Sequence, residues 1–207
     1  MPRAGFWRLL IGVVAALAVA CAQPVATDAD TFQRWLAADP ARAPAFARFE
    51  AMLAREGVAG VIESRELWLT DRLAPECVVE PFTMPPEEFW PRIVPALRFM
   101  RDHVKPAVGE VTVASGYRDE AFNRCVEGAS RSAHLQYQAL DLLPLDPAVS
   151  REDLIALLCP IHAREGRRFG IGLGIYQARR FHIDARGYRG WGEDFHASTF
   201  PCASSAS

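Results

Sequence analysis

The first half of the chain carries two hydrophobic patterns of helical period. Between residues 31 and 56, apolar side chains recur every three or four positions, the spacing of one helical face. Pro40 and Pro44 interrupt this pattern, so it predicts two helices. A second pattern runs from Pro86 to about residue 104, starting with proline and acidic residues as helices often do. We expect Lys105 and Pro106 to end that helix.

The second half alternates short strand-like runs with helices. Asp119 and Ser150 are suited to cap helices over residues 119–126 and 151–164, and Gly166 is expected to stop the second one. The expected strands cover residues 66–69, 111–113, 137–143, 171–176 and 180–184. Because no regular βαβ alternation appears, the pattern predicts an α+β fold, with a small central antiparallel sheet flanked by helices.

The N-terminus has the features of an export signal. Arg3 and Arg8 precede an apolar run at residues 9–20 that is too short to span a bilayer comfortably, and Ala-Val-Ala stands just before Cys21. Cleavage after Ala20 is one expected outcome. Lipidation of Cys21 is the other, since Ala-Val-Ala-Cys is similar to a bacterial lipobox. Either outcome predicts an exported protein, located in the periplasm or held at a membrane by a lipid.

The remaining length fits one compact domain preceded by an N-terminal segment. The chain has 207 residues, of which 50% are hydrophobic. We expect residues 22–84 to form a helical and irregular segment packed on a domain at residues 85–202, and residues 203–207 to be a disordered tail. We expect the protein to be a monomer.

Charge and cysteine content narrow the classes of partner and site. Without residues 1–20, 21 basic residues face 25 acidic ones, a net charge of −4, and no basic stripe stands out, which argues against a nucleic-acid partner. The chain has five cysteines, and four remain if Cys21 is a processing or lipid site. An even number in an exported chain predicts two disulfides with three possible pairings. The absence of any Cys-x-x-Cys pair argues against a cysteine metal site. The four cysteines other than Cys21 are Cys77, Cys125, Cys159 and Cys202.

Two histidines and an aspartate are candidate metal ligands. His134 and Asp141 are seven residues apart, so a straight strand would turn them to opposite faces. Both can face one metal only if the chain bends between them, near Tyr137. His182 lies in a short apolar run and shares a strand face with Arg180 and Asp184. Two imidazoles and one carboxylate with an open fourth position suit a catalytic Zn²⁺.

Two further polar residues accompany these candidates. Arg118 follows a predicted strand and the turn at Ser115-Gly116, where its guanidinium can grip a carboxylate through two hydrogen bonds. Ser132 stands two residues before His134 and can donate to the same ligand.

The order of these residues resembles that of a known family. The series S-G-Y-R, N, G-x-x-x-S-x-H, A-x-D, F-H-I-D and R-G-W closely resembles the M15 zinc D-alanyl-D-alanine peptidases over residues 85–192. These belong to the LAS group of peptidoglycan hydrolases, whose fold the Hedgehog signalling domain shares. The resemblance implies Zn²⁺ ligands at His134, Asp141 and His182. It also implies that Arg118 and Ser132 hold the terminal carboxylate of a substrate.

The chain departs from the family pattern at two positions. The family usually has glycine where Tyr137 stands, and tyrosine is strained at positive φ. We therefore expect a differently built turn and a distorted metal site. Many relatives carry an acid where Arg179 stands, so the catalytic base is expected at Asp184, which could instead orient His182. Glu193 and His196 are the alternatives for the base.

Together these features predict a zinc-dependent peptidoglycan peptidase, either a D-Ala-D-Ala carboxypeptidase or an endopeptidase. The partner would be a stem peptide or a cross-link of the cell wall. The alternative is a non-catalytic, zinc-containing module of the same fold that binds the cell wall. A third interpretation, a structural lipoprotein without metal, predicts that His134, Asp141 and His182 lie far apart.

Overall fold

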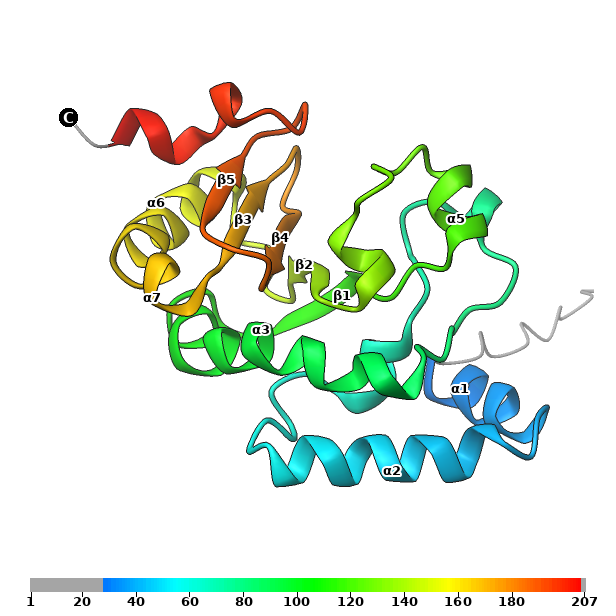
Figure 1. Ribbon diagram of the computed structural model, residues 1–207. Coiled ribbons are helices and arrows are strands. Elements are labelled where there is room, and N and C mark those ends of the chain that lie inside the picture. The colour runs from blue at the N-terminus through cyan, green and yellow to red at the C-terminus, as the bar shows by residue number, and fades with distance from the viewer. Residues whose placement is uncertain (1–27, 206–207) are drawn as a thin grey trace, which may run out of the picture.

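The computed structural model describes residues 28–205 and has a mixed α/β fold built around one five-stranded sheet (Figure 1). The predicted export signal, Cys21 and the last two residues lie outside this range. The strand order is β1-β2-β4-β3-β5. The strands are β1 Val111–Ser115, β2 Ala139–Pro144, β3 Gly172–Ile175, β4 Phe181–Asp184 and β5 Arg189–Trp191. The α+β prediction, with its central sheet and flanking helices, is confirmed.

Four strands are antiparallel, as the sequence predicts, and the fifth is not. β1 pairs with β2, β2 with β4, and β4 with β3, all antiparallel. β5, which the sequence pattern did not predict, pairs parallel to β3 along the opposite edge of the sheet. The expectation of a purely antiparallel sheet is therefore wrong at this edge. A three-residue strand, Arg-Gly-Trp, is too short and too polar to give a period-2 signal.

The two faces of the sheet differ in chemistry. The register pairs Asp141 with His182, and Gly174 pairs with the same histidine from the other side. Since side chains alternate along strands, the neighbours of these residues point to the opposite face. That face is apolar and buried, and it forms part of the main core. It carries Leu140, Leu142, Leu173, Ile175, Phe181 and Ile183.

Helices pack on the apolar core and surround the sheet (Figure 1). The α-helices are α1 Asp28–Ala37, α2 Arg42–Arg55, α3 Val94–Phe99, α4 Lys105–Val108, α5 Glu120–Cys125, α6 Arg151–Ile161 and α7 Arg167–Phe169. The two N-terminal helices, the Asp119 cap of α5 and the Ser150 capping box of α6 all match the sequence prediction.

Two helical stretches run further than the sequence suggested. The stretch that begins at Glu87 continues through α3, the π-helix Met100–Val104 and α4, so Pro106 does not end it. Pro106 lies next to the junction between the π-helix Met100–Val104 and α4. Gly109, at φ 87°, ends the stretch instead. Likewise Gly166 does not stop the helix after α6, which continues through the π-helix His162–Gly166 and α7 to Gly170 at φ 63°.

The N-terminal segment packs on the rest of the domain. α2 lies along the outside of the stretch that contains α3 (Figure 1), with ion pairs from Arg48 to Glu87 at 2.8 Å and from Arg98 to Glu56 at 3.0 Å. The stretch around residues 66–69, expected to be extended, is instead the 3-10 helix Ser64–Trp68. Buried aromatic rings join these elements in one cluster. Its members include Phe32, Trp35, Phe49, Trp68, Phe82 and Trp90.

The same segment covers the free edge of β1. Glu66 Oε2 accepts hydrogen bonds from the Thr112 hydroxyl at 2.8 Å and the Val113 N–H at 2.9 Å. Asp71 forms an isolated antiparallel bridge with Ser115. An uncovered edge strand invites pairing with other chains, so this segment protects the sheet.

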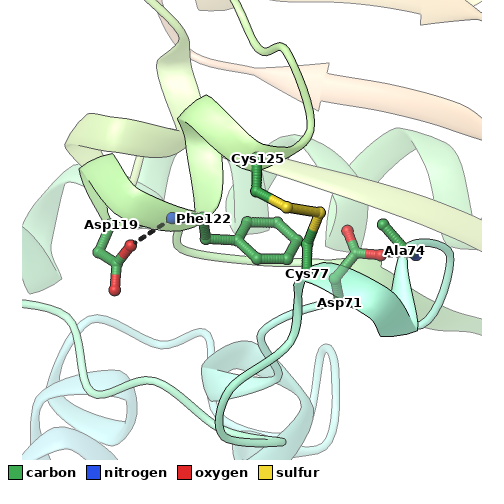
Figure 2. Close-up of a disulfide and its surroundings, with 6 residues drawn as sticks. All are labelled: Asp71, Ala74, Cys77, Asp119, Phe122 and Cys125. Atoms are coloured by element: carbon green, nitrogen blue, oxygen red, sulfur yellow. Dashed lines mark hydrogen bonds between the residues drawn. A yellow bond between two sulfur atoms is a disulfide. The ribbon is translucent and has the colours of Figure 1, made fainter.

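The prediction of two disulfides is confirmed, and the structure selects one of the three pairings. Cys77 is bonded to Cys125, which ties the irregular N-terminal segment to α5 (Figure 2). Cys159 is bonded to Cys202, which fastens the C-terminal segment to α6. That segment ends in the 3-10 helix Pro201–Ser205, so residues 203–205 are helical where a disordered tail was expected. Within residues 28–205, no helix is long and apolar enough to cross a membrane.

Candidate metal centre

The three predicted metal ligands converge on the polar face of the sheet. His182 Nδ1 lies 2.9 Å from Asp141 Oδ1 and 3.3 Å from His134 Nε2. His134 Nε2 lies 3.6 Å from the same carboxylate oxygen. The three ligand atoms are all within 4.8 Å of one another, and all three residues are buried. The interpretation in which these residues lie far apart is therefore excluded.

A left-handed residue makes this convergence possible. His134 lies in the 3-10 helix Ala133–Gln136, and Tyr137 follows it at φ 52° and ψ 41°, before β2 begins at Ala139. The bend expected between His134 and Asp141 is thus present. The expectation that tyrosine would force a different turn is wrong, because Tyr137 itself adopts the positive φ that favours glycine.

The Tyr137 ring is fixed far from the solvent. It is fully buried, its hydroxyl donates to Leu67 O at 3.1 Å, and its ring contacts Phe49 and Tyr117. Burial of an aromatic ring contributes more than the roughly 1–2 kcal/mol that a left-handed residue costs. The N-terminal segment therefore helps to hold the bend that brings His134 to Asp141.

Each histidine has its second ring nitrogen engaged. His134 Nδ1 lies 2.7 Å from Gly116 O, so this nitrogen donates and Nε2 is left as the ligand atom. His182 Nε2 lies 3.0 Å from Asp184 Oδ2, which leaves Nδ1 as the ligand atom. Hydrogen bonds of this kind fix the tautomer and ring orientation of metal-bound histidines.

The protonation equilibria of His134 and Asp141 suit a cation. Burial, helped by the Arg118 charge, lowers the pKa of His134 to about 4. Burial works to raise the pKa of Asp141, but the two histidines outweigh it and hold that pKa well below its usual range. Burial likewise works to lower the pKa of His182, while hydrogen bonds with Asp141 and Asp184 raise it. An ionised carboxylate therefore faces two buried imidazole rings.

The donor set fits Zn²⁺. Bonds of about 2.0–2.1 Å to nitrogen and oxygen in tetrahedral geometry separate the ligand atoms by about 3.3 Å. The three separations here, 2.9, 3.3 and 3.6 Å, lie around that value. His134, Asp141 and His182 would hold the ion and leave a fourth position open.

Asp184 lies on the far side of the His182 ring from Asp141. It is fully buried, and both its oxygens are engaged. Oδ2 faces His182 Nε2 and accepts from Arg189 Nη2 at 2.6 Å, while Oδ1 accepts from Arg186 N at 2.8 Å and Arg189 Nη1 at 3.0 Å. Of the two roles expected for Asp184, orienting His182 fits this geometry better than accepting a proton.

Glycines in β3 leave room for the groups that support His182. A Cβ added at Gly172 would lie 2.7 Å from Asp184 Oδ2, and one at Gly174 would lie 2.5 Å from Trp191 Nε1. The alternation Gly-Leu-Gly-Ile in β3 is the sequence signal of this crowding. The sequence pattern indicated no role for Trp191, Arg189 or Tyr176, although all three border the candidate metal centre.

Arg118 and Ser132 lie at the edge of the centre. Arg118 Nη2 donates to Asp141 Oδ2 at 3.0 Å, and its Nε donates to Ser115 Oγ at 3.1 Å. Its backbone N–H donates to His134 O at 3.3 Å, which joins its loop to the ligand loop. Ser132 Oγ accepts from His134 N at 3.3 Å. Both side chains are only partly buried, so both remain accessible next to the ligands.

The remaining candidates lie away from the ligand atoms. Arg179 donates to Asp146 O at 2.8 Å, so its charge is turned from the centre. Arg180 is nearer, with Nη1 3.9 Å from Asp141 Oδ2. Glu193 and His196 are exposed on the loop after Trp191, and neither forms a hydrogen bond or ion pair with a ligand residue within the described range.

The chain matches a known protein family. A sequence model described as Peptidase M15 matches residues 64–184, more than half of the chain. The matched range holds all three ligand residues as well as Arg118, Ser132 and Asp184. It begins in the 3-10 helix of the N-terminal segment. Neither a curated protein nor a solved structure matches the chain.

Proposed function

The chain belongs to the peptidase M15 family, and we propose that it is an exported zinc peptidase that cleaves peptidoglycan stem peptides or cross-links. The observation that carries this proposal is the meeting of His134, Asp141 and His182 with Arg118 beside them. The D-Ala-D-Ala bond is the proposed target, attacked either as a carboxypeptidase or as an endopeptidase would attack it.

Arg118 and Ser132 would position the substrate by its carboxylate. Two guanidinium N–H groups of Arg118 are used within the protein, and its Nη1 has no partner among the described residues. A guanidinium fixed in this way offers a preorganised donor to a carboxylate. The Ser132 hydroxyl lies on the loop that carries His134, so a substrate held by both residues would lie against the ligand atoms.

A bound Zn²⁺ would supply a Lewis acid and lower the pKa of a water ligand to about 7. Asp141 and His134 would hold the ion through groups that carry no proton at neutral pH. Asp184 would keep His182 in the tautomer that presents Nδ1, and Arg189 would in turn fix Asp184. The chain thereby builds a rigid frame whose geometry does not depend on the substrate.

We place the proton acceptor on the loop after Trp191. Asp184 is fully buried and shares its oxygens with Arg186, Arg189 and His182, so it has no free site for another proton donor. Glu193 is exposed and makes no hydrogen bond or ion pair within residues 28–205. Phe195 on the same loop packs on Tyr176, with 5.4 Å between the ring centroids, and Tyr176 borders the centre. Glu193 is therefore our assignment for the base, with His196 as the alternative on the same loop.

Export would place this activity beside its substrate. We propose secretion to the periplasm, or attachment of the mature chain to a membrane through a lipid on Cys21. Two disulfides support an oxidising compartment, since such bonds persist outside the cytosol.

The test is an assay of the purified protein on defined wall fragments. We expect zinc-dependent release of D-alanine from an acyl-D-Ala-D-Ala peptide, or cleavage of a cross-linked dimer. The two products distinguish the two subtypes. Arg118→Met is expected to lower kcat/KM at least about 10-fold, as loss of a charged hydrogen-bond donor does. Arg124→Met, on the exposed side of α5, is the matched control.

A zinc-loaded protein that cleaves neither fragment would instead favour the non-catalytic module. A resin carrying the same fragments would then retain the wild-type protein but not the Arg118→Met variant.

A further inference from the structure

Tyr176 lies beside the metal-ligand residues without holding any of them. It follows β3 directly, and its backbone N–H donates to Arg180 O at 3.0 Å, which continues the β3–β4 ladder. Because side chains alternate along strands, Tyr176 and Gly174 face the same side of the sheet as His182 and Asp141. Only 5% of Tyr176 is exposed.

Trp191 places the Tyr176 hydroxyl near His182. Trp191 Nε1 donates to the hydroxyl oxygen at 3.0 Å. The indole lies close over Gly174, which is the strand partner of His182. It also meets the His182 ring, with 5.0 Å between the centroids. The phenol therefore points back along β3 toward His182.

Arg180 links the same phenol to Asp141. Its guanidinium carbon stacks 4.2 Å from the centroid of the Tyr176 ring. Its Nη1 lies 3.9 Å from Asp141 Oδ2. Tyr176 therefore contacts two side chains that each lie beside a ligand residue. Trp191 lies beside His182, and Arg180 lies beside Asp141.

The hydrogen of this phenol has no acceptor within the part of the chain that the structure describes. A phenol both accepts and donates, and the accepting position is taken by Trp191. The O–H must therefore point away from the indole. A buried hydroxyl usually finds an acceptor, so an unused one next to a metal centre indicates that a ligand supplies it.

We propose that Tyr176 is a catalytic residue, whose O–H donates a hydrogen bond to the scissile carbonyl oxygen as that oxygen gains negative charge. The inference rests on the proposed peptidase function. No bond to the tyrosine forms or breaks, and its proton stays on the phenol. Trp191 and Gly174 are positioning residues, because the first holds the hydroxyl and the second leaves room for the indole.

The test separates this role from a structural one. Tyr176→Phe keeps the buried ring and removes only the donor. We expect kcat to fall about 10²-fold with KM nearly unchanged, as with other single oxyanion donors. Zinc content and the thermal unfolding midpoint should stay at wild-type values. Tyr188→Phe, a partly exposed tyrosine stacked on His162, is the matched control and should retain full activity.

A binding measurement keeps the inference independent of turnover. The probe is a phosphinate analogue of D-Ala-D-Ala, titrated calorimetrically into the zinc-loaded protein. We expect Tyr176→Phe to weaken its binding by at least about 10-fold, and Trp191→Phe to weaken it less.

The outcomes distinguish the two proposals. If the wild type cleaves no wall fragment but Tyr176→Phe still weakens phosphinate binding, the peptidase proposal and the catalytic role of Tyr176 fail, and only its role as a hydrogen-bond donor to a bound ligand stands. If the wild type cleaves fragments and Tyr176→Phe matches it in kcat and phosphinate affinity, the donor assignment is overturned alone. A wild type that neither cleaves fragments nor binds the phosphinate overturns both.

Discussion

Asp184 holds the imidazole of His182 from the side opposite Asp141, with Nε2 3.0 Å from Oδ2. His182 is thereby fixed between two carboxylates, one that faces the other ligands and one that faces the interior. The buried acid is itself fixed by Arg189 and by the Arg186 backbone. This chain of contacts explains why an acid two residues after His182 supports the metal centre without touching the open coordination position.

Asp184→Asn is expected to weaken zinc binding and to leave part of the activity. The amide oxygen still accepts from His182 Nε2, but the charge that balances the ring and Arg189 is lost. Changes to partners of metal-bound histidines typically cost about 10–100-fold in affinity. Competition with a chromophoric chelator measures this change. Exposed Asp194→Asn is the control, and an unaltered zinc affinity with complete loss of turnover would return Asp184 to the role of base.

Glu193→Gln is expected to lower kcat about 10²-fold or more at unchanged zinc content, as loss of a general base does. The reason is that Glu193 has an uncommitted carboxylate on the loop beside the centre. His196→Gln provides the comparison on the same loop. If His196→Gln loses kcat and Glu193→Gln does not, the base is His196.

Tyr137→Gly is expected to destabilise the fold even though glycine accepts the left-handed conformation more easily. Relief of strain contributes about 1–2 kcal/mol, whereas removal of a buried aromatic ring costs about 3–5 kcal/mol. Tyr137→Phe should cost only about 1 kcal/mol, for the hydrogen bond to Leu67 O. Urea denaturation measures both. A Tyr137→Gly variant as stable as the wild type would show that the ring does not hold the bend.

Tyr137 also shows what could and could not be predicted from the sequence. The spacing of His134 and Asp141 required a bend near Tyr137, so its place was predictable. The residue type at this position argues against a positive φ. The contacts that stabilise it come from Phe49 and Leu67, which are far from Tyr137 in the sequence. Such long-range packing leaves no mark in a short motif.

The support of His182 was predictable only in part. The strand pattern placed His182 and Asp184 on one face, but the role of the acid depends on Arg189, which belongs to a strand too short to recognise. The glycines of β3 were visible in the sequence. The reason for them is visible only in the structure, where Asp184 and Trp191 occupy the space that a Cβ at Gly172 or Gly174 would fill.

Zinc affinity is expected to rise with pH up to the raised pKa of His182. Without metal, hydrogen bonds to Asp141 and Asp184 outweigh burial and raise the pKa of His182, so its ring keeps a proton above pH 6.5. Zinc binds His182 only when Nδ1 carries no proton. At a pH below the raised pKa, zinc binding therefore releases the proton of His182, and at a pH above that pKa it releases none from this residue. Calorimetry in buffers of different ionisation enthalpy counts the protons released. No release at pH 6 would contradict the protonation assigned to His182.

The most direct test of the metal centre is zinc X-ray absorption combined with metal analysis of the purified protein. We predict about one zinc per chain, with two imidazole nitrogens and only light oxygen or nitrogen atoms in its first shell at about 2.0–2.2 Å. In His134→Ala the zinc should be largely lost. A wild type without zinc, or a zinc bound to sulfur, would contradict the assignment of His134, Asp141 and His182 as its ligands.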